Sequence, residues 1–175
     1  MSANPYWIEG PWPGKLAIVP RPSGGDWLDR DLRSLKKSGI DDVASLLMKG
    51  EAAELELADE QAGCLRNGLQ FHSLPIPDRG IPKSREELQK FTNELSGLLA
   101  EGRGVGVHCR QGIGRSGIIA ASLLISSGVD PEEALRRISR ARGLPVPETT
   151  EQAEWIREFA RRMNSTKSEL ALKIK

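Results

Sequence analysis

Cys109, Arg115 and the glycines between them are the residues of this sequence whose types and spacing are best suited to chemistry. The stretch from His108 to Ser116 reads HCRQGIGRS, and an apolar helical pattern follows it. Two glycines let successive backbone N–H groups turn into one concavity, where they can bind an anion. The start of the next helix adds free N–H groups and the positive end of its dipole. The 109–115 segment is therefore predicted to be a phosphate-binding loop.

The predicted phosphate-binding set is the run that follows the cysteine: Arg110, Gln111, Gly112, Ile113, Gly114 and Arg115. The planar guanidinium of Arg115 can bridge two oxygens of a tetrahedral oxyanion. The same N–H groups and guanidinium favour a thiolate, and such settings lower the pKa of a cysteine from about 8.5 to below neutrality. A thiolate at the base of a phosphate cradle can attack phosphorus in line. We therefore predict a phosphocysteine intermediate on Cys109, with no metal and no cofactor.

Strand and helix patterns alternate along the chain and must position this loop. Two short strands joined by a Pro/Gly turn are predicted within residues 6–22, and further strand patterns cover 41–48, 69–76 and 105–108. Helical patterns cover 26–39, 51–68, 84–102, 116–128, 130–143 and 149–164, and the alternative for 51–68 is a helix broken near Ala58. Alternation of this kind predicts an α/β fold, a three-layer sandwich whose mostly parallel central sheet is flanked by helices. We predict a single catalytic domain over residues 1–165 and a C-terminal tail over residues 166–175.

Asp78 is the second reactive side chain that this arrangement of strands and helices places near the loop. It follows the predicted strand 69–76, and Cys109 follows the predicted strand 105–108. In open α/β sheets, ligands bind outside the carboxyl ends of the strands. Asp78 and Cys109 are therefore expected at the same edge of the sheet. The alternative is that Asp78 is only a turn residue after Pro77.

Length and composition narrow the class of protein. The 175 residues fit one domain, and 38% hydrophobic with 28% charged residues is typical of a globular protein. A net charge of +1 gives no indication of nucleic-acid or membrane-surface binding. No apolar run approaches the roughly 18 residues that span a bilayer. Two cysteines without a signal peptide favour a reducing, cytoplasmic setting over a disulfide scaffold.

The segment HCRQGIGRSG resembles the signature of the cysteine-based protein tyrosine and dual-specificity phosphatases. Element order, length and the position of Asp78 extend the resemblance over most of the chain. The compact dual-specificity group, which includes cyclin-dependent kinase-associated phosphatase and bacterial relatives, is the most similar. The resemblance implies that Cys109 is the nucleophile and that Arg115 binds phosphate and stabilises the transition state. It implies that the Ser116 hydroxyl assists the thiolate as leaving group in the second step.

The same resemblance requires a general acid on a separate loop. Asp78, about 30 residues before the cysteine, would protonate the leaving oxygen and then act as base toward water. Gln152 matches a glutamine that orients the hydrolytic water, and an ordinary helix-surface residue is the alternative. His108 is implied to tune the thiolate through the loop, and a packed core histidine is the alternative.

The implied function is that of a protein phosphatase acting on phosphotyrosine. The chain is too short for the elements that build a deep phosphotyrosine-only cleft, so phosphoserine and phosphothreonine are expected as well. The expected partners are a phosphorylated protein or peptide and a phosphate or sulfate ion in the loop, with no nucleic acid and no membrane. A phosphoinositide, nucleotide or RNA 5′-phosphate is the alternative substrate. Phosphoinositide-specific members tend to carry two lysines in the loop, where this chain has one basic residue, Arg110.

Other roles for a cysteine in an anion cradle are a non-catalytic phosphate-binding module, a rhodanese-type sulfurtransferase and a thiol arsenate reductase. Asp78 on its separate loop favours the phosphatase over the sulfurtransferase and the reductase. The presence of Cys109, Arg115 and Asp78 together disfavours the binding module, which would normally have lost one of them. Cys109 as a small buried hydrophobic residue is the structural alternative. Cys64, on the predicted helix 51–68, is a candidate for a disulfide with Cys109 under oxidation.

Overall fold

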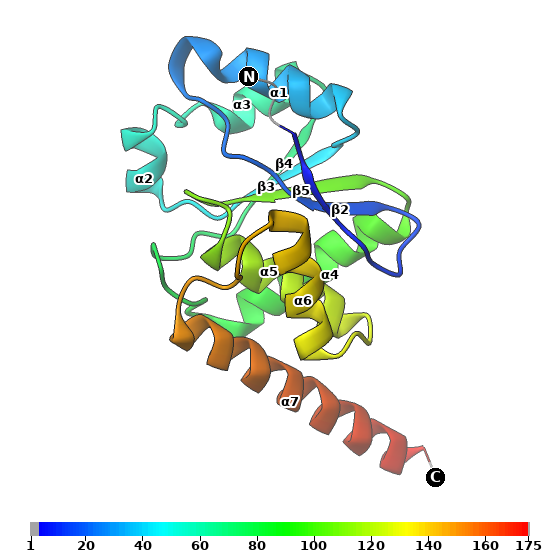
Figure 1. The fold of residues 1–175 in the computed structure, drawn as a ribbon. Helices are drawn as coiled ribbons and strands as arrows, with labels where there is room; N and C mark the ends of the chain where they lie inside the picture. The colour runs from blue at the N-terminus through cyan, green and yellow to red at the C-terminus, as the bar shows by residue number, and fades with distance from the viewer. Residues whose placement is uncertain (1–3, 175) are drawn as a thin grey trace.

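The computed structural model describes residues 4–174, and its centre is a five-stranded sheet between two layers of helices (Figure 1). The strands are β1 (Tyr6–Ile8), β2 (Lys15–Ile18), β3 (Asp42–Ser45), β4 (Gln70–Ser73) and β5 (Gly104–His108). They lie in the order β1-β2-β5-β3-β4. β1 runs antiparallel to β2, and the other three pairs are parallel. The predicted α/β fold with a mostly parallel sheet is confirmed.

One face of the sheet is covered by the short helices, and the other by the long ones (Figure 1). The first layer holds η1 (Gly25–Trp27), α1 (Leu28–Lys37), α2 (Lys49–Glu54) and α3 (Glu60–Arg66). The second holds α4 (Arg85–Ala100), α5 (Gly114–Ser126), α6 (Pro131–Arg142) and α7 (Thr150–Lys173). Side chains alternate across the strands: in β2, Leu16 and Ile18 face the larger apolar cluster and Ala17 faces the smaller one.

The helix that follows the cysteine loop lies at the centre of the second layer. Every residue of α5 from Gly114 to Ile125 is buried, which accounts for the nearly continuous apolar pattern of its sequence. α4, α6 and α7 pack around it. The start of α5, and with it the 109–115 segment, is therefore held on several sides.

Two helix starts follow from local sequence. The Ser84 hydroxyl accepts a hydrogen bond from the Glu87 N–H at 3.1 Å and starts α4. Asp130 caps α6, and Pro131 occupies its first position. The segment predicted as a helix over residues 51–68, with a break near Ala58 as the alternative, forms two helices, α2 and α3, separated by residues 55–59.

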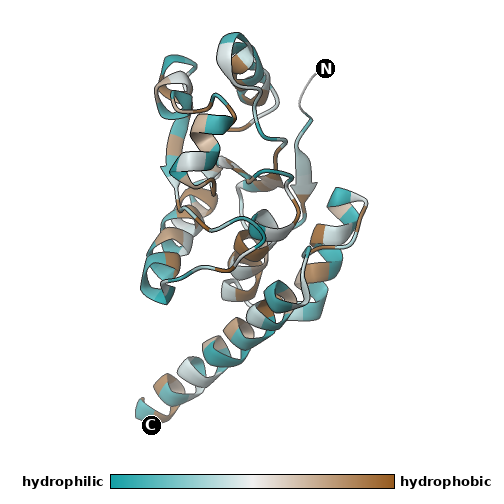
Figure 2. Ribbon diagram, turned by 90° about the vertical axis from the view of Figure 1, so that its left-hand side faces the viewer, coloured by the Kyte–Doolittle hydropathy of each residue, from teal (hydrophilic) through white to brown (hydrophobic). Residues whose placement is uncertain are grey.

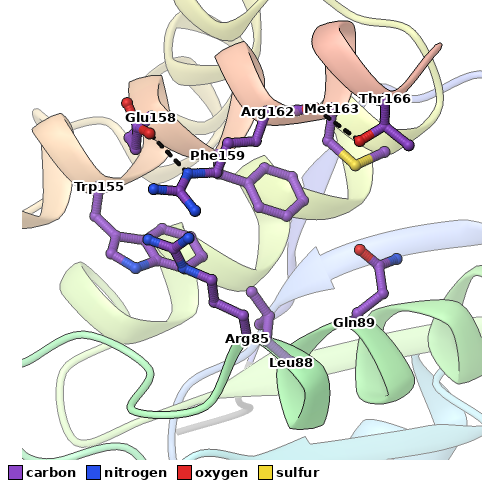
Figure 3. Close-up of a pocket in the computed structure, with 9 residues that line it drawn as sticks. All are labelled: Arg85, Leu88, Gln89, Trp155, Glu158, Phe159, Arg162, Met163 and Thr166. Carbon is purple, nitrogen blue, oxygen red and sulfur yellow. Dashed lines mark hydrogen bonds and ion pairs between the residues drawn. The ribbon is translucent and has the colours of Figure 1, made fainter. Parts of the chain in front are cut away.

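The last helix differs most from its prediction. α7 continues to Lys173, where a tail was predicted from residue 166, and its last turns extend beyond the body of the protein (Figure 2). Closer to its start, Trp155 and Phe159 stack with ring centroids 5.6 Å apart and face Leu88 of α4 across a groove of about 160 Å³ (Figure 3). Among residues 4–174, no helix is long and apolar enough to cross a membrane.

A cluster of charges ties β3 and β4 to the second layer. The buried Asp42 carboxylate accepts from Arg103 Nε at 2.6 Å and lies 2.9 Å from His72 Nε2. The other ring nitrogen of His72 lies 2.8 Å from Glu94 Oε1 of α4. The hydrogen bond with Asp42 raises the pKa of His72, burial lowers it, and the Glu94 carboxylate raises it again, so that the net pKa lies above its usual value.

The protonated form of His72 therefore stabilises the folded protein. A pKa raised on folding gives stability that is complete below the unfolded value of about 6.5 and is lost as pH rises through the folded value. We expect His72→Gln to lower the free energy of unfolding by about 1–3 kcal/mol at pH 6. We expect the difference from wild type to shrink as pH rises. Urea unfolding of both proteins at each pH measures it, and a pH-independent difference would contradict the assignment.

Candidate active site

Cys109 lies directly after β5, at the carboxyl end of the strand and in front of the N-terminus of α5. Its side chain is buried, and its sulfur accepts a hydrogen bond from the Gly112 N–H at 3.2 Å. Gly112 has φ +66°, in the left-handed region that favours glycine. A Cβ at that position would lie 3.0 Å from the Ile18 side chain. The tight curl of the loop thus requires this glycine twice, for backbone conformation and for space.

The surroundings of Cys109 favour its thiolate. Burial raises the pKa of the thiol, but the nearby hydroxyl and N–H of Ser116, the charge of Arg115 and the Gln111 N–H outweigh burial, so that the net pKa is below its usual value. Ser116 itself is buried. Among the described residues its hydroxyl has no partner in full hydrogen-bond geometry. It lies near the sulfur as an available donor.

Arg115 is held in place by two carboxylates. Its side chain is only 2% exposed, and its two Nη atoms donate to both oxygens of Glu51 at 2.7 and 2.9 Å. Nη2 also donates to Asp78 Oδ1 at 2.8 Å. Burial lowers the pKa of Arg115, but the Glu51 hydrogen bond and the nearby negative charges raise it, so that the guanidinium remains charged. The fork is therefore rigid before any substrate binds.

Asp78 lies in the loop between β4 and α4, and its carboxylate is half exposed. The ion pair with Arg115 brings it beside Cys109 at the edge of the sheet, as the strand order predicted. Its neighbour Arg79 has φ +57° and forms an ion pair with Glu148 at 3.3 Å. The loop is thus fixed at two points around the carboxylate.

A cavity of about 190 Å³ lies over the thiol. The residues that line it are Asp78, Arg79, Cys109, Arg110, Gln111, Gly114, Arg115 and Glu148. The six residues of the predicted phosphate-binding set lie in three kinds of position. Four of its members line the cavity, Gly112 donates to the sulfur, and Ile113 packs against the larger apolar cluster.

His108 is fully buried and belongs to an ion pair that the sequence did not predict. Its Nε2 lies 2.7 Å from Glu60 Oε1 at the start of α3, and its Nδ1 lies 3.4 Å from the Cys109 carbonyl oxygen. Burial lowers the pKa of His108, but the Glu60 charge and hydrogen bond raise it above the usual value overall. The His108 ring thus sits directly behind the cysteine.

Gln152 is also buried, and its amide is used in backbone contacts. Its Oε1 accepts from the N–H groups of Glu148 and Thr149 at 3.2 and 3.1 Å. Its Nε2 donates to the Gly80 carbonyl at 3.1 Å. Gln152 therefore connects the start of α7 to the Asp78 loop, and it is not an exposed helix residue. Its assignment to the hydrolytic water stays a prediction.

Three carboxylates of the site were missed from the sequence: Glu51, Glu60 and Glu148. Glu51 and Glu60 lie in a segment that is rich in glutamate throughout, so no pattern distinguishes them. The two cysteines remain free thiols, and Cys64 lies in the smaller apolar cluster, where burial raises its pKa to about 12. The disulfide between them stays untested.

Comparison with known proteins shows the family of this chain. The family model described as a polymorphic toxin system, DSP-PTPase phosphatase, matches residues 19–129, which include Asp78, Cys109 and Arg115. The chain belongs to the dual-specificity and tyrosine phosphatase family. Cyclin-dependent kinase inhibitor 3 of Rattus norvegicus is 31% identical over 134 residues, which are 75% of this chain and 63% of that relative. The chain thus spans less than two thirds of that relative's length.

Further members of the dual-specificity and tyrosine phosphatase family show the same likeness. The tyrosine-protein phosphatase of Autographa californica nuclear polyhedrosis virus is 33% identical over 86 residues, 45% of this chain and 48% of that one. The solved structure of Tk-PTP in its active form has a TM-score of 0.75 at 28% identity and covers 93% of this chain and 99% of its own.

Kinase-associated phosphatase, solved with its catalytic-site cysteine replaced by serine, shares the fold of this chain. Its TM-score is 0.84 at 23% identity, over 94% of this chain and 97% of its own. PTPMT1 in complex with PI(5)P has the same fold at a TM-score of 0.72 and 21% identity, over 91% and 98%.

Proposed function

We propose that this chain is a protein phosphatase that hydrolyses phosphotyrosine, phosphoserine and phosphothreonine monoesters through a phosphocysteine intermediate. The observation that carries the proposal is the meeting of three groups at one cavity. They are a Cys109 thiol of lowered pKa, the rigid Arg115 fork and the Asp78 carboxyl. Nucleophile, oxyanion binder and proton donor are the parts that transfer of a phosphoryl group to a thiolate requires.

In the first step, the Cys109 thiolate attacks phosphorus and an S–P bond forms as the ester P–O bond breaks. Arg115 binds two of the non-bridging oxygens, with help from the N–H groups of the loop. Asp78 delivers its proton to the leaving oxygen. The dephosphorylated hydroxyl of tyrosine, serine or threonine then leaves.

In the second step, water attacks the phosphocysteine and the S–P bond breaks. Asp78, now a carboxylate, takes a proton from the water. The Ser116 hydroxyl, which is buried near the sulfur, stabilises the departing thiolate. Inorganic phosphate leaves, and both the thiolate and the acid are restored.

The ion pairs beside the cavity favour a substrate with a single phosphate group. Arg110, the basic residue within the loop, is drawn toward acidic neighbours, with Glu54 at 3.5 Å and Glu51 at 3.9 Å. Glu148 adds a negative charge to the lining. A substrate with several phosphates would meet these carboxylates. PTPMT1, which has the same fold, was solved in complex with the phosphoinositide PI(5)P. Phosphoinositides are therefore the substrate class to compare with protein phosphomonoesters.

The experiment that tests the function compares wild type with Asp78→Asn in excess chelator. Both proteins are assayed for phosphate release from a phosphoserine peptide, a phosphotyrosine peptide, p-nitrophenyl phosphate and phosphoinositide vesicles. For Asp78→Asn we expect kcat to fall by about 10²–10⁴-fold on phosphoserine, because an alkoxide leaves poorly without a proton. We expect a much smaller loss on p-nitrophenyl phosphate, whose leaving group is stable as an anion.

Glu54→Gln is the matched control, because Glu54 is an exposed carboxylate that pairs with Arg110 and does not line the cavity. It should change rates by no more than a few-fold. Equal losses on both leaving groups for Asp78→Asn would overturn the general acid. Wild-type turnover of vesicles alone would replace the protein substrate by a phosphoinositide. No turnover of any substrate would overturn the catalytic proposal.

A further inference from the structure

Arg142 contacts the cysteine loop from outside the cavity. It is the last residue of α6 and half-buried. Its Nε donates to the Gly112 carbonyl at 2.6 Å, and its Nη2 donates to the Gln111 carbonyl at 3.3 Å. Arg142 is not among the residues that line the cavity. One guanidinium thus binds two successive backbone carbonyls on the outer side of the loop.

Peptide geometry connects this outer contact to the thiol. In a trans peptide unit, the C=O and the N–H point in opposite directions. The Gln111 carbonyl and the Gly112 N–H belong to the same unit. That N–H donates to Cys109 Sγ at 3.2 Å, while Arg142 binds the carbonyl at the other end. A cation that fixes and polarises the carbonyl therefore also aims the N–H at the sulfur and strengthens its hydrogen bond.

Tyr6 holds Arg142 in place. The guanidinium carbon lies 4.1 Å from the centroid of the Tyr6 ring, which is cation–π geometry. Tyr6 belongs to β1 and pairs in register with Ile18 of β2, whose side chain lies against Gly112. β1, β2 and the end of α6 thus enclose the outer side of the loop. Tyr6 and Arg142 both lie outside the 19–129 segment that matches the family model.

We propose that Arg142, held by Tyr6, is a positioning residue for the Cys109 thiolate. It orients the Gln111–Gly112 and Gly112–Ile113 peptide units so that the N–H groups of Gly112 and Ile113 turn toward the sulfur and the phosphate. The inference rests on the proposed function, in which the loop binds phosphate, and it adds residues from both ends of the chain to the site.

Other titratable and charged groups around the Cys109 thiol also influence its ionisation. Arg115 faces it from α5, His108 from β5 and Asp78 from the loop after β4. Glu51 of α2 acts on it through Arg115, and Arg110 lies in the loop itself. Arg142 adds a cation from α6 on the side opposite the cavity, so its removal leaves each of these groups in place.

The test measures the ionisation of Cys109 directly. The rate of alkylation by iodoacetamide is followed against pH in wild type, Arg142→Met and the control Arg140→Met. Arg140 is an exposed arginine on the same helix, two positions earlier. Cys64 does not interfere, because burial raises its pKa to about 12. We expect the inflection for Arg142→Met to move to higher pH and that for Arg140→Met to stay at the wild-type position.

Turnover of p-nitrophenyl phosphate gives the second readout. We expect kcat/KM to fall by about 10–100-fold in Arg142→Met, because small displacements of positioning groups cost this much. In Arg142→Lys the charge is kept but only one carbonyl is reached, so we expect a kcat/KM between those of wild type and Arg142→Met.

The alkylation readout separates failure of this inference from failure of the proposed function. If wild type turns over no phosphate monoester, the pH inflections still test Arg142. Identical inflections and rates in Arg142→Met and Arg140→Met would overturn the positioning role. If Arg142→Met does not give a cooperative thermal transition, Arg142→Lys is compared with wild type instead. A wild-type pH inflection for alkylation together with a wild-type kcat/KM in Arg142→Lys would overturn the positioning role of Arg142.

Discussion

Replacing Cys109 by serine is expected to reduce turnover of phosphate monoesters by about 10⁶-fold, the scale seen when a nucleophile is removed from an enzyme that works through a covalent intermediate. A serine hydroxyl in this loop does not ionise near neutral pH, whereas the nearby polar groups of Ser116 and the charge of Arg115 favour the thiolate of Cys109. The N–H groups and Arg115 remain in the variant. Phosphate binding is therefore expected to persist.

Steady-state assays of Cys109→Ser measure the loss of turnover, and calorimetric titration with inorganic phosphate measures whether phosphate binding persists. Cys64→Ala is the matched control, because Cys64 is a buried thiol in the other apolar cluster and should be dispensable for turnover. Turnover near the wild-type rate in Cys109→Ser would remove the nucleophile assignment. Loss of phosphate binding in that variant would show that the sulfur itself holds the loop in shape.

Arg115→Lys is expected to lower kcat/KM by about 10³-fold, the upper range for loss of one donor to a transition-state oxyanion. The guanidinium donates to Glu51 through both Nη atoms and to Asp78 through one. An ammonium is a point charge that cannot present two parallel donors to phosphate while it satisfies Glu51. The variant therefore loses both the fork and the link to the general acid.

The control for this variant is Arg110→Lys, a conservative change at a loop arginine that lines the same cavity but is far more exposed. We expect a change of only a few-fold there. Thermal unfolding of Arg115→Lys is measured in parallel, since Glu51 keeps a cationic partner in the variant. A mild effect of Arg115→Lys on kcat/KM, with unchanged stability, would contradict the role of the fork.

Much of the fold and the centre of the site could be predicted from the sequence because they depend on local features. The positive φ of Gly112, the start of α5 at Gly114 and the buried strand before Cys109 lie within about ten residues of one another. Their geometry is set by glycine conformational freedom, helix termini and apolar pattern. The proximity of Asp78 to Cys109 could be predicted because parallel strands present their carboxyl ends at one edge of the sheet.

The partners that tune these groups were decided by the tertiary structure. Glu51 lies 64 positions from Arg115, Glu60 lies 48 from His108, and Arg142 lies 30 from Gly112. These contacts arise from the strand order β1-β2-β5-β3-β4, which places segments remote in sequence around one loop. Ion pairs have no period along the chain, and a glutamate that clamps the Arg115 guanidinium has the same sequence signature as its solvated neighbours. The sequence by itself thus determined the reactive groups, and the packing of the sheet and helices determined the charges that surround them.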